Sequence, residues 1–164
     1  MTGDYFHTGD KGEIDSDGFL KITGRKKEMF KTSGGKYVIP TLLENDLKQS
    51  RFIEQIMVIG EGEKMPAALI QPNFEFIKDW IEKKKKNIGT TPLEIANSQI
   101  IIDRIQREVD KCNKKFGKWE QIKRFELTDQ VWSITSGHLT PTMKMKRNVI
   151  KDLHKDLYEK IYRS

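Results

Sequence analysis

The sequence predicts an α+β domain, because short extended segments and amphipathic helices follow one another without the regular alternation of repeated βαβ units. Glycine-rich turns and alternating apolar residues dominate residues 1–40, which is typical of hairpins. Later segments carry apolar residues three or four positions apart, the period of a helix with one buried face. We therefore expect a short central sheet and a hairpin, flanked by helices.

Two hairpins are expected near the start of the chain. Asp15–Gly18 is a tight-turn signal between Glu13–Ile14 and the alternating segment Phe19–Thr23. Farther along, Met29–Thr32 and Lys36–Ile39 are predicted to be short extended segments on either side of a glycine pair.

A helix is expected to begin at Pro40 and Thr41 and to run through Leu47. Thr41 and Glu44 have the spacing of a capping box, in which the two side chains bond each other's backbone amides.

The middle of the chain is predicted to form an antiparallel pair of strands, Glu54–Gly60 and Ala67–Pro72. Asn73 can then cap a helix by accepting a backbone hydrogen bond. The apolar side of that helix is expected to consist of Phe74, Ile77, Trp80 and Ile81.

Helices and one strand are expected in the remaining sequence. Thr91 and Glu94 again have capping-box spacing, with Pro92 at the first helical position. The next helix is expected to stop near Gly117, and a strand is predicted around residues 122–127, followed by an irregular stretch. The buried residues expected are Ile101, Ile105, Val109, Cys112 and Phe116 in that helix, and Val149 or Ile150, Leu153, Leu157 and Ile161 in a last helix.

Length and composition describe one highly charged domain. Of the 164 residues, 36% are hydrophobic and 33% charged, which suffices for a single hydrophobic core. No apolar run approaches the ~20 residues that cross a bilayer, and the start Met1–Tyr5 lacks the pattern of a signal peptide. The net charge of +6 indicates an anionic partner only weakly, because much of it lies in Lys83–Lys86, a run typical of a solvated helix face.

Four segments together carry the chemistry: Tyr5–Asp10, Gly24–Glu28, Lys31–Lys36 and Leu139–Arg147. In this order they resemble the adenylate-forming superfamily of acyl-CoA synthetases, peptide-synthetase adenylation domains and luciferases. The phrases Gly18–Arg25 and Lys31–Tyr37, and the Leu-Thr-Pro-Thr form of the last motif, resemble the long-chain fatty acyl-CoA synthetase branch. The resemblance covers nearly the whole chain. Any one motif alone is weak, whereas four in order are strong.

The resemblance implies three nucleotide-binding residues. Asp10 would accept hydrogen bonds from the ribose diol of ATP, as acidic residues do in other nucleotide sites. Arg25 would contact the nucleotide through its planar guanidinium, and Lys36 matches a basic position near phosphate. Taken singly, Asp10 is better explained as an ordinary turn aspartate and Arg25 as a surface cation, and Lys36 ends a segment that also reads as a hairpin turn.

The resemblance also implies a hinge at Lys27, and hence two parts. Residues 1–26 would end the N-terminal domain and form a linker hairpin, and residues 27–164 would be a mobile catalytic lid. A charged residue with few packing partners suits a hinge, although an exposed loop lysine has the same exposure. On the lid, Lys31 matches a lysine of one half-reaction, and Gly34 and Gly35 would face the pantetheine channel of CoA in the thioester-forming state.

The last motif is expected to supply the catalytic cation. A fatty carboxylate that attacks the α-phosphate of ATP brings two anions together, and a lysine bridging both stabilises the transition state. Alignment of Leu-Thr-Pro-Thr with the more usual Leu-Pro-Arg-Thr assigns this role to Lys146. Lys144 competes for it, because the glycine that usually precedes the lysine is Met145 here.

Several other residues are assigned structural roles. His7, His138 and His154 are too far apart in sequence, beside a single cysteine, to suggest a metal site. Cys112 lies on an apolar helix stripe and is expected in the core, where it forms no internal disulfide; this fits a cytoplasmic protein. The three tryptophans, Trp80, Trp119 and Trp132, are expected to pack rather than to stack on bases.

The implied parent enzyme is a fatty acid–CoA ligase that uses ATP and CoA, with Mg²⁺ accompanying the ATP, and releases AMP and pyrophosphate. Fatty-acid binding and the glycine-rich phosphate loop are expected on a larger N-terminal domain, so the chain is taken as a C-terminal fragment that is inactive alone. Alternatives are an adenylating enzyme for another carboxylic acid, a stand-alone nucleotide- or CoA-binding module, and a nucleic-acid-binding protein, which no arginine–aromatic motif supports. Peripheral membrane contact stays open, since the branch handles long acyl chains.

Overall fold

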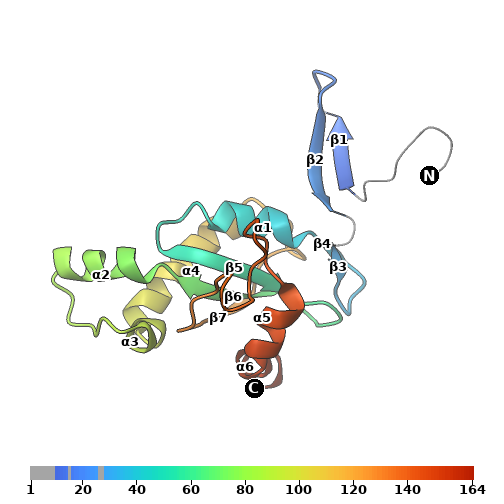
Figure 1. The fold of residues 1–164 in the computed structure, drawn as a ribbon. Helices are drawn as coiled ribbons and strands as arrows, with labels where there is room; N and C mark the ends of the chain where they lie inside the picture. Colours follow the sequence, from blue (N-terminus) through green and yellow to red (C-terminus); the bar gives the residue numbers. More distant parts are fainter. Residues whose placement is uncertain (1–9, 15, 26–27) are drawn as a thin grey trace.

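A three-stranded sheet forms the centre of the domain in the computed structural model, which describes residues 10–14, 16–25 and 28–164 (Figure 1). Its strands are β5 (Ile53–Ile59), β6 (Ala67–Pro72) and β7 (Arg124–Leu127), in the order β5-β6-β7. β5 and β6 are antiparallel, as predicted, whereas β6 and β7 are parallel. The predicted α+β class, with a short central sheet flanked by helices, is confirmed.

A helical connection joins the two parallel strands. It contains α2 (Phe74–Lys83), α3 (Pro92–Ala96) and α4 (Gln99–Asn113) between the end of β6 and the start of β7. Parallel neighbours require such a crossover, because the chain must return to the same edge of the sheet before it can pair again. The sequence predicts a strand at β7 but does not predict that it runs parallel to β6.

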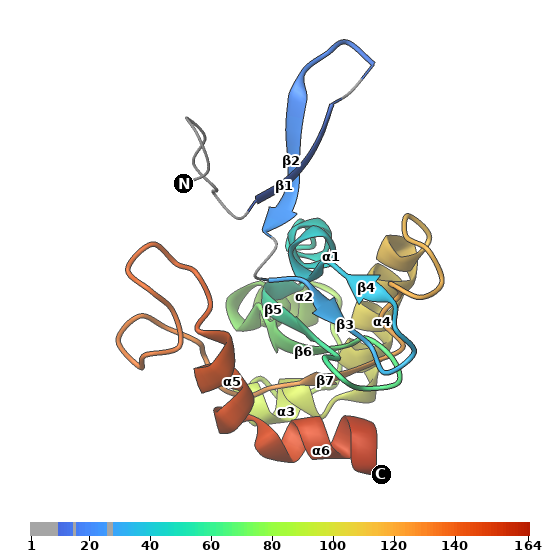
Figure 2. The same cartoon turned by 90° about the vertical axis from the view of Figure 1, so that its right-hand side faces the viewer.

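Both faces of the sheet are covered, and each belongs to its own hydrophobic cluster. On β5, Ile56 and Val58 join the cluster that contains the buried residues of α1, α2 and α4, whereas Met57 and Ile59 join the cluster that contains Ile150 and Ile161. Successive side chains of a strand point to opposite faces, so a strand covered on both sides is apolar throughout. Figure 2 shows α5 and α6 on one side of this sheet and α1 on the other.

Two hairpins precede the sheet, as predicted. β1 (Asp10–Ile14) pairs antiparallel with β2 (Leu20–Arg25), and β3 (Phe30–Lys31) pairs antiparallel with β4 (Tyr37–Val38). The β1–β2 hairpin stands away from the body of the domain, whereas the β3–β4 hairpin lies against it (Figures 1 and 2).

The helix after β4 is α1 (Pro40–Leu47), and the predicted capping box in it is wrong. Ile39 is the N-cap residue and makes no side-chain cap, so Thr41 lies inside the helix. The Glu44 side chain is buried and accepts a hydrogen bond from the Val58 amide at 2.9 Å instead. The Glu44 carboxylate therefore bonds a residue on β5 that is distant in sequence, and not the backbone at the helix start, as the local spacing predicts.

The other predicted caps have mixed outcomes. Asn73 Oδ1 accepts from the Phe76 amide at 3.1 Å, and the capping box between Thr91 and Glu94 is present, so both predictions are confirmed. The predicted stop at Gly117 is wrong, because α4 ends at Asn113. The Asn113 side chain bonds both backbone groups of Ile122, each at 2.9 Å, which ties the helix end to the chain entering β7.

The buried face predicted for α4 is confirmed for Ile101, Ile105, Val109 and Cys112, each at most 1% exposed. Phe116 lies beyond the helix and is partly buried against the same cluster.

The predicted last helix is two helices, α5 (Arg147–Leu153) and α6 (Lys155–Arg163), with a break at His154. Ile150, the alternative to Val149, and Ile161 are buried and Leu157 is partly buried, as expected, but Leu153 is 42% exposed. The break changes the direction of the helix axis, so the apolar spacing of the sequence does not continue on one face. None of the described helices has both the length and the apolar character of a membrane span.

His154 is buried at this break and is expected to make stability depend on pH. Trp132 Nε1 donates to His154 Nε2 at 2.8 Å, so this nitrogen must be unprotonated. Burial lowers the pKa of His154 below its ordinary value of 6.5, against the opposing effect of Asp156 and Asp129. As pH falls below 6.5 the unfolded chain binds a proton that the folded chain refuses, so stability is present above that pH and is lost below it.

We expect the free energy of unfolding to fall between pH 7 and pH 5.5, with a contribution from His154 of at most about 1.4 kcal/mol per pH unit. His154→Gln keeps an acceptor for the Trp132 indole but does not titrate, and should remove that contribution. Urea unfolding at several pH values measures it. An unchanged pH dependence in the variant would contradict this role of His154.

Candidate functional site

The motif that carries the two candidate catalytic lysines forms a small hairpin, here called the lysine loop (Leu139–Lys146). Its two legs pair through a bridge between Leu139 and Met145 and through the hydrogen bonds Thr140 N to Lys144 O at 2.8 Å and Lys146 N to His138 O at 2.9 Å. At the tip, the Met143 amide donates to the Thr140 carbonyl at 2.8 Å, with Pro141 in the turn. Proline at this position presets a type I turn.

The turn is completed by a residue in the left-handed conformation, Met143, at a φ of 64°. This combination is common in three-residue hairpin loops, where glycine is usual, and a side chain there costs about 1–2 kcal/mol. The Thr140 hydroxyl lies 3.1 Å from the Thr142 hydroxyl and accepts from the Lys144 amide, also at 3.1 Å. These bonds give the tip a defined shape despite its exposure.

The loop is anchored at its base and open at its tip. Leu139 is 1% exposed and belongs to the hydrophobic cluster of Met57, Ile59 and Ile150. Lys144 and Lys146 are both exposed, and their positions two residues apart on one leg put them on the same side. Among the described residues neither ammonium group has a hydrogen-bond or ion-pair partner. The loop thus presents two exposed cations beside each other.

The residue after Lys146 is half-buried and bonds a buried carboxylate. Arg147 Nη1 and Nη2 donate to Glu44 Oε1 and Oε2 at 2.6 and 2.8 Å, a bidentate pair. The Glu44 side chain is 4% exposed, and its Oε1 also accepts from the Val58 amide. Burial by itself would lower the pKa of Arg147. The hydrogen bonds to Glu44 and its negative charge outweigh burial, so the pKa is raised and the guanidinium stays charged.

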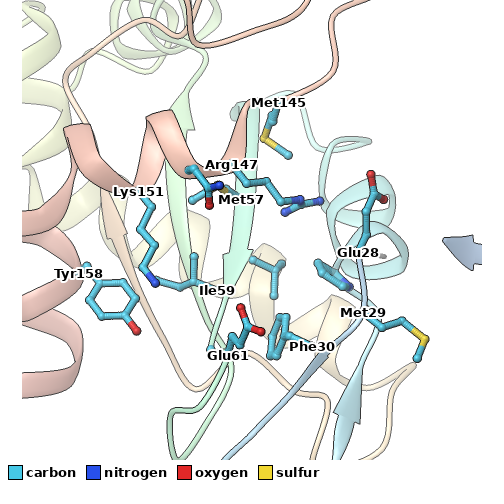
Figure 3. A pocket seen from close by; sticks show the side chains of 14 residues that line it. Glu28, Met29, Phe30, Met57, Ile59, Glu61, Met145, Arg147, Lys151 and Tyr158 are labelled. Atoms are coloured by element: carbon cyan, nitrogen blue, oxygen red, sulfur yellow. The ribbon is translucent and has the colours of Figure 1, made fainter. Parts of the chain in front are cut away.

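A cavity of about 430 Å³ lies beside this pair, between the segment entering β3, the strand β5 and the two C-terminal helices. Met145, Arg147 and Lys151 line it from one side, and Glu28 and Phe30 from the other (Figure 3). In Figure 3 the Arg147 side chain extends from α5 across this cavity, toward the side on which Glu28 lies. The cavity therefore lies between the base of the lysine loop and the segment just after the predicted hinge.

The segment Lys31–Lys36 is the turn of the β3–β4 hairpin. Thr32 N donates to Lys36 O and Gly35 N to Thr32 O, each at 2.9 Å, and Gly35 has a φ of 82° that favours glycine. Gly34 and Gly35 are both exposed. The turn is held against the domain by a bond from the Ser33 amide to the Glu63 carbonyl at 2.9 Å.

Both lysines of this hairpin are exposed and lie over aromatic rings. Lys31 Nζ is 5.7 Å from the centre of the Tyr37 ring, and Lys36 Nζ is 5.8 Å from that of Trp119. Trp119 is half-exposed, and its ring packs against Gly117 and under Lys36, as the prediction that it packs requires. The hairpin and the lysine loop leave the body on different sides of the domain (Figure 2).

The structure brings together two of the three predicted nucleotide residues. Asp10 and Arg25 are direct cross-strand partners at the open end of the β1–β2 hairpin. Lys36 lies on the other hairpin. Lys27, the predicted hinge, and the segment before Asp10, including His7, lie outside the described residues. The domain boundary between residues 26 and 27 falls there as well, and stays a prediction.

Cys112, Trp132 and Trp80 have the packing roles predicted for them. Cys112 is buried, and burial, with Asp46 beside it, raises the pKa of its thiol to about 12, which leaves it protonated at neutral pH. Trp132 is buried and Trp80 packs against Phe52 with ring centres 5.5 Å apart. Within the described ranges, no three histidine, cysteine or acidic residues gather as a metal site would require.

Comparison with known families decides the assignment. A model of the AMP-binding enzyme C-terminal domain matches residues 28–164. The chain belongs to this family. The match begins at the residue after Lys27 and includes the lysine loop and the β3–β4 hairpin with its turn Lys31–Lys36, here called the glycine hairpin.

Relatives of this AMP-binding enzyme C-terminal domain are much longer. The chain is 37% identical over 162 residues to Long-chain-fatty-acid–CoA ligase FadD15 of Mycobacterium tuberculosis, and 35% identical over 161 residues to Fatty acyl-CoA synthetase B of Dictyostelium discoideum. The alignments include 99% and 96% of this chain but 27% and 24% of those proteins. The chain thus spans about a quarter of the length of these relatives.

Solved structures agree on the fold. The adenylation domain of the carboxylate reductase from Mycobacterium chelonae superposes with a TM-score of 0.73 at 22% identity, over 97% of this chain and 23% of that one. The anthranilate CoA ligase AuaEII in complex with anthranoyl-AMP has a TM-score of 0.59 at 24% identity, over 93% of this chain and 25% of that one.

Sequence reasoning missed the buried pair between Glu44 and Arg147. Glu44 was assigned to a helix cap, and Arg147 was grouped with the basic residues of the last motif. The sequence does contain a sign of this pair. Glu44 lies between Leu43 and Leu47 on the apolar side of its helix, so a charged residue occupies a position that faces the core. Buried charges are usually paired, so this position predicted a cationic partner of unknown identity.

Proposed function

We propose that this chain is the C-terminal domain of an ATP-dependent long-chain fatty acid–CoA ligase. The observation that carries the proposal is the lysine loop, a shaped hairpin with Lys144 and Lys146 exposed and unpaired beside each other among the described residues. Two relatives named as fatty acyl-CoA synthetases or ligases align with nearly the whole chain, which supports a fatty acid as substrate. A larger N-terminal domain, which would bind the acyl chain, is the proposed partner.

The first half-reaction is adenylation. A carboxylate oxygen of the fatty acid attacks the α-phosphorus of ATP, and the bond to pyrophosphate breaks. Lys146 would lie between the two oxygens that approach each other, and its positive charge would offset their repulsion. Lys144, on the same side of the loop, is the competing residue.

Asp10 and Arg25 would hold the nucleotide. Their backbones are cross-strand partners at the open end of the hairpin. A carboxylate acceptor would suit the ribose diol, and a guanidinium donor would suit a ribose or phosphate oxygen. Mg²⁺ would accompany ATP and offset phosphate charge, with protein ligands, if any, on the larger domain.

The second half-reaction forms the thioester. The CoA sulfur, having lost its proton, attacks the acyl carbonyl carbon, and AMP leaves. The exposed glycine pair Gly34 and Gly35 allows a close approach of the pantetheine arm, with Lys31 at the base of the turn and Lys36 near phosphate. Because this hairpin and the lysine loop lie on different sides of the domain, rotation about Lys27 would exchange them at one site.

The test uses this domain joined to its larger N-terminal domain. We expect fatty-acid-dependent exchange of pyrophosphate into ATP, followed by acyl-CoA and AMP on addition of CoA, and no turnover by the 164-residue chain alone. Exchange that depends on aryl or amino acids, and not on fatty acids, would contradict the substrate class. Turnover by the chain alone would contradict the proposed division of labour. A cytoplasmic location, with peripheral membrane contact through the long acyl substrate, belongs to the same proposal.

A further inference from the structure

We propose that Arg147 and Glu44 are positioning residues: their buried ion pair sets where the lysine loop holds Lys146 during adenylation. The inference rests on the proposed function of the lysine loop. It gives a role to Glu44, which lies outside the four motifs, and to Arg147, which ends the fourth motif but has no role assigned there. Its basis is the bidentate pair at 2.6 and 2.8 Å, whose carboxylate is almost completely buried.

The pair ties three elements together at the start of α5. Glu44 belongs to α1, its Oε1 also accepts the Val58 amide of β5, and Arg147 is the first residue of α5. An exposed ion pair fixes little, because solvent competes for both partners. Here the carboxylate is buried and engaged from two directions, so the guanidinium has one geometry to adopt.

α5 has few other means of keeping its orientation. It is seven residues long, and its N-cap residue, Lys146, makes no side-chain cap. Of its apolar residues only Ile150 is buried, while Val149 and Leu153 are exposed. At the far end, the C-cap residue His154 is buried and bonded to Trp132, so Ile150 and His154 hold the C-terminal half of α5. The pair at Arg147 is a second anchor, at the N-terminal end, and it prevents that end from turning away.

Lys146 is joined directly to this second anchor. Its amide bonds the His138 carbonyl at 2.9 Å, and its carbonyl accepts from the Ile150 amide at 3.1 Å, so its backbone belongs both to the loop and to α5. A turn of α5 would therefore move Lys146 relative to the sheet. A misplacement of about 1 Å at a reacting centre can cost about 100-fold in rate.

A purely structural role and a positioning role differ in which half-reaction they affect. Loss of folded protein slows both half-reactions by the same factor, since both need the domain. Loss of loop position slows adenylation, which uses Lys146, but spares thioester formation from a preformed acyl-adenylate, which uses the glycine hairpin. The ratio of the two rates in one sample is independent of the folded fraction.

The experiment measures both rates in the intact two-domain enzyme carrying Arg147→Met, which keeps a long side chain but removes the charge and the fork. We expect adenylation to fall about 100-fold, with thioester formation from added acyl-adenylate changed less than threefold. Glu44→Gln, which keeps an acceptor for the Val58 amide, should shift the ratio in the same direction. Arg147→Lys, which restores the charge without the fork, should recover part of the loss.

Arg104→Met is the matched control. Arg104 also pairs with a glutamate, Glu108 at 2.7 Å within α4, and lies over the Phe52 ring. Both partners lie outside the lysine loop and outside the β3–β4 hairpin. Arg104→Met should leave the ratio unchanged. Equal losses in both half-reactions for Arg147→Met, or no loss, would overturn the positioning role. Absence of fatty-acid adenylation in the unmodified enzyme would instead overturn the proposed function.

Discussion

Lys146→Ala in the intact enzyme is expected to slow adenylation about 100- to 1000-fold, the usual effect of removing one preorganised electrostatic contact from a transition state. The side chain is exposed and without a partner among the described residues, so the substitution removes no packing. Thioester formation from added acyl-adenylate should stay within about threefold. Exchange of labelled pyrophosphate into ATP measures the first step, and acyl-CoA release measures the second.

Lys144→Ala is the matched control, because it removes an equally exposed lysine from the same side of the same loop. We expect a loss of less than about tenfold, from the weaker field at the site. The reverse order of the two effects would transfer the catalytic role to Lys144. Unchanged adenylation in both variants would remove the lysine loop from the mechanism.

Leu139→Ala is expected to lower the free energy of unfolding of this chain by about 2–5 kcal/mol, the cost of a large-to-small change in a core that cannot collapse. Leu139 is 1% exposed and packs where the lysine loop meets the second hydrophobic cluster. Urea unfolding at constant pH, with the slope compared between variants, measures the change.

Leu153→Ala makes the same chemical change at a position that apolar spacing assigned to the core. The structure has this side chain 42% exposed, so we expect a loss of less than about 1 kcal/mol. Similar losses of unfolding free energy in Leu139→Ala and Leu153→Ala would mean that α5 packs as one continuous helix with α6, as the spacing predicted. That result would contradict the break at His154.

Local features of the sequence predicted local structure well. Asn73 precedes its helix and caps it, and the spacing of Thr91 and Glu94 forms the predicted box, because each interaction lies within one turn. The strand pair β5–β6 follows from two apolar runs joined by a glycine-containing turn. The same holds for the four motifs, whose order along the chain indicated the family that the comparison then established.

Predictions failed where a residue's partner is distant in sequence. Glu44 has capping-box spacing to Thr41, but its carboxylate instead accepts hydrogen bonds from the Val58 amide and from Arg147. A buried charge needs more partners than a helix end supplies. Spacing within Val149–Ile161 predicts one helix, but the bond between His154 and Trp132 accompanies a break in it. The direction of β7 depends on which strand it meets after the helical crossover.

The sequence by itself determined most of the strands and helices, the caps formed by Asn73 and by Thr91 with Glu94, and the motifs that assign the chain to its family, because those depend on residues a few positions apart. Only the tertiary structure decided that Lys144 and Lys146 are exposed on an anchored hairpin, that Arg147 is held by Glu44, and that the glycine hairpin lies on another side of the domain. Each of these is a relation between segments far apart in the chain, and it exists only after packing has removed the alternatives.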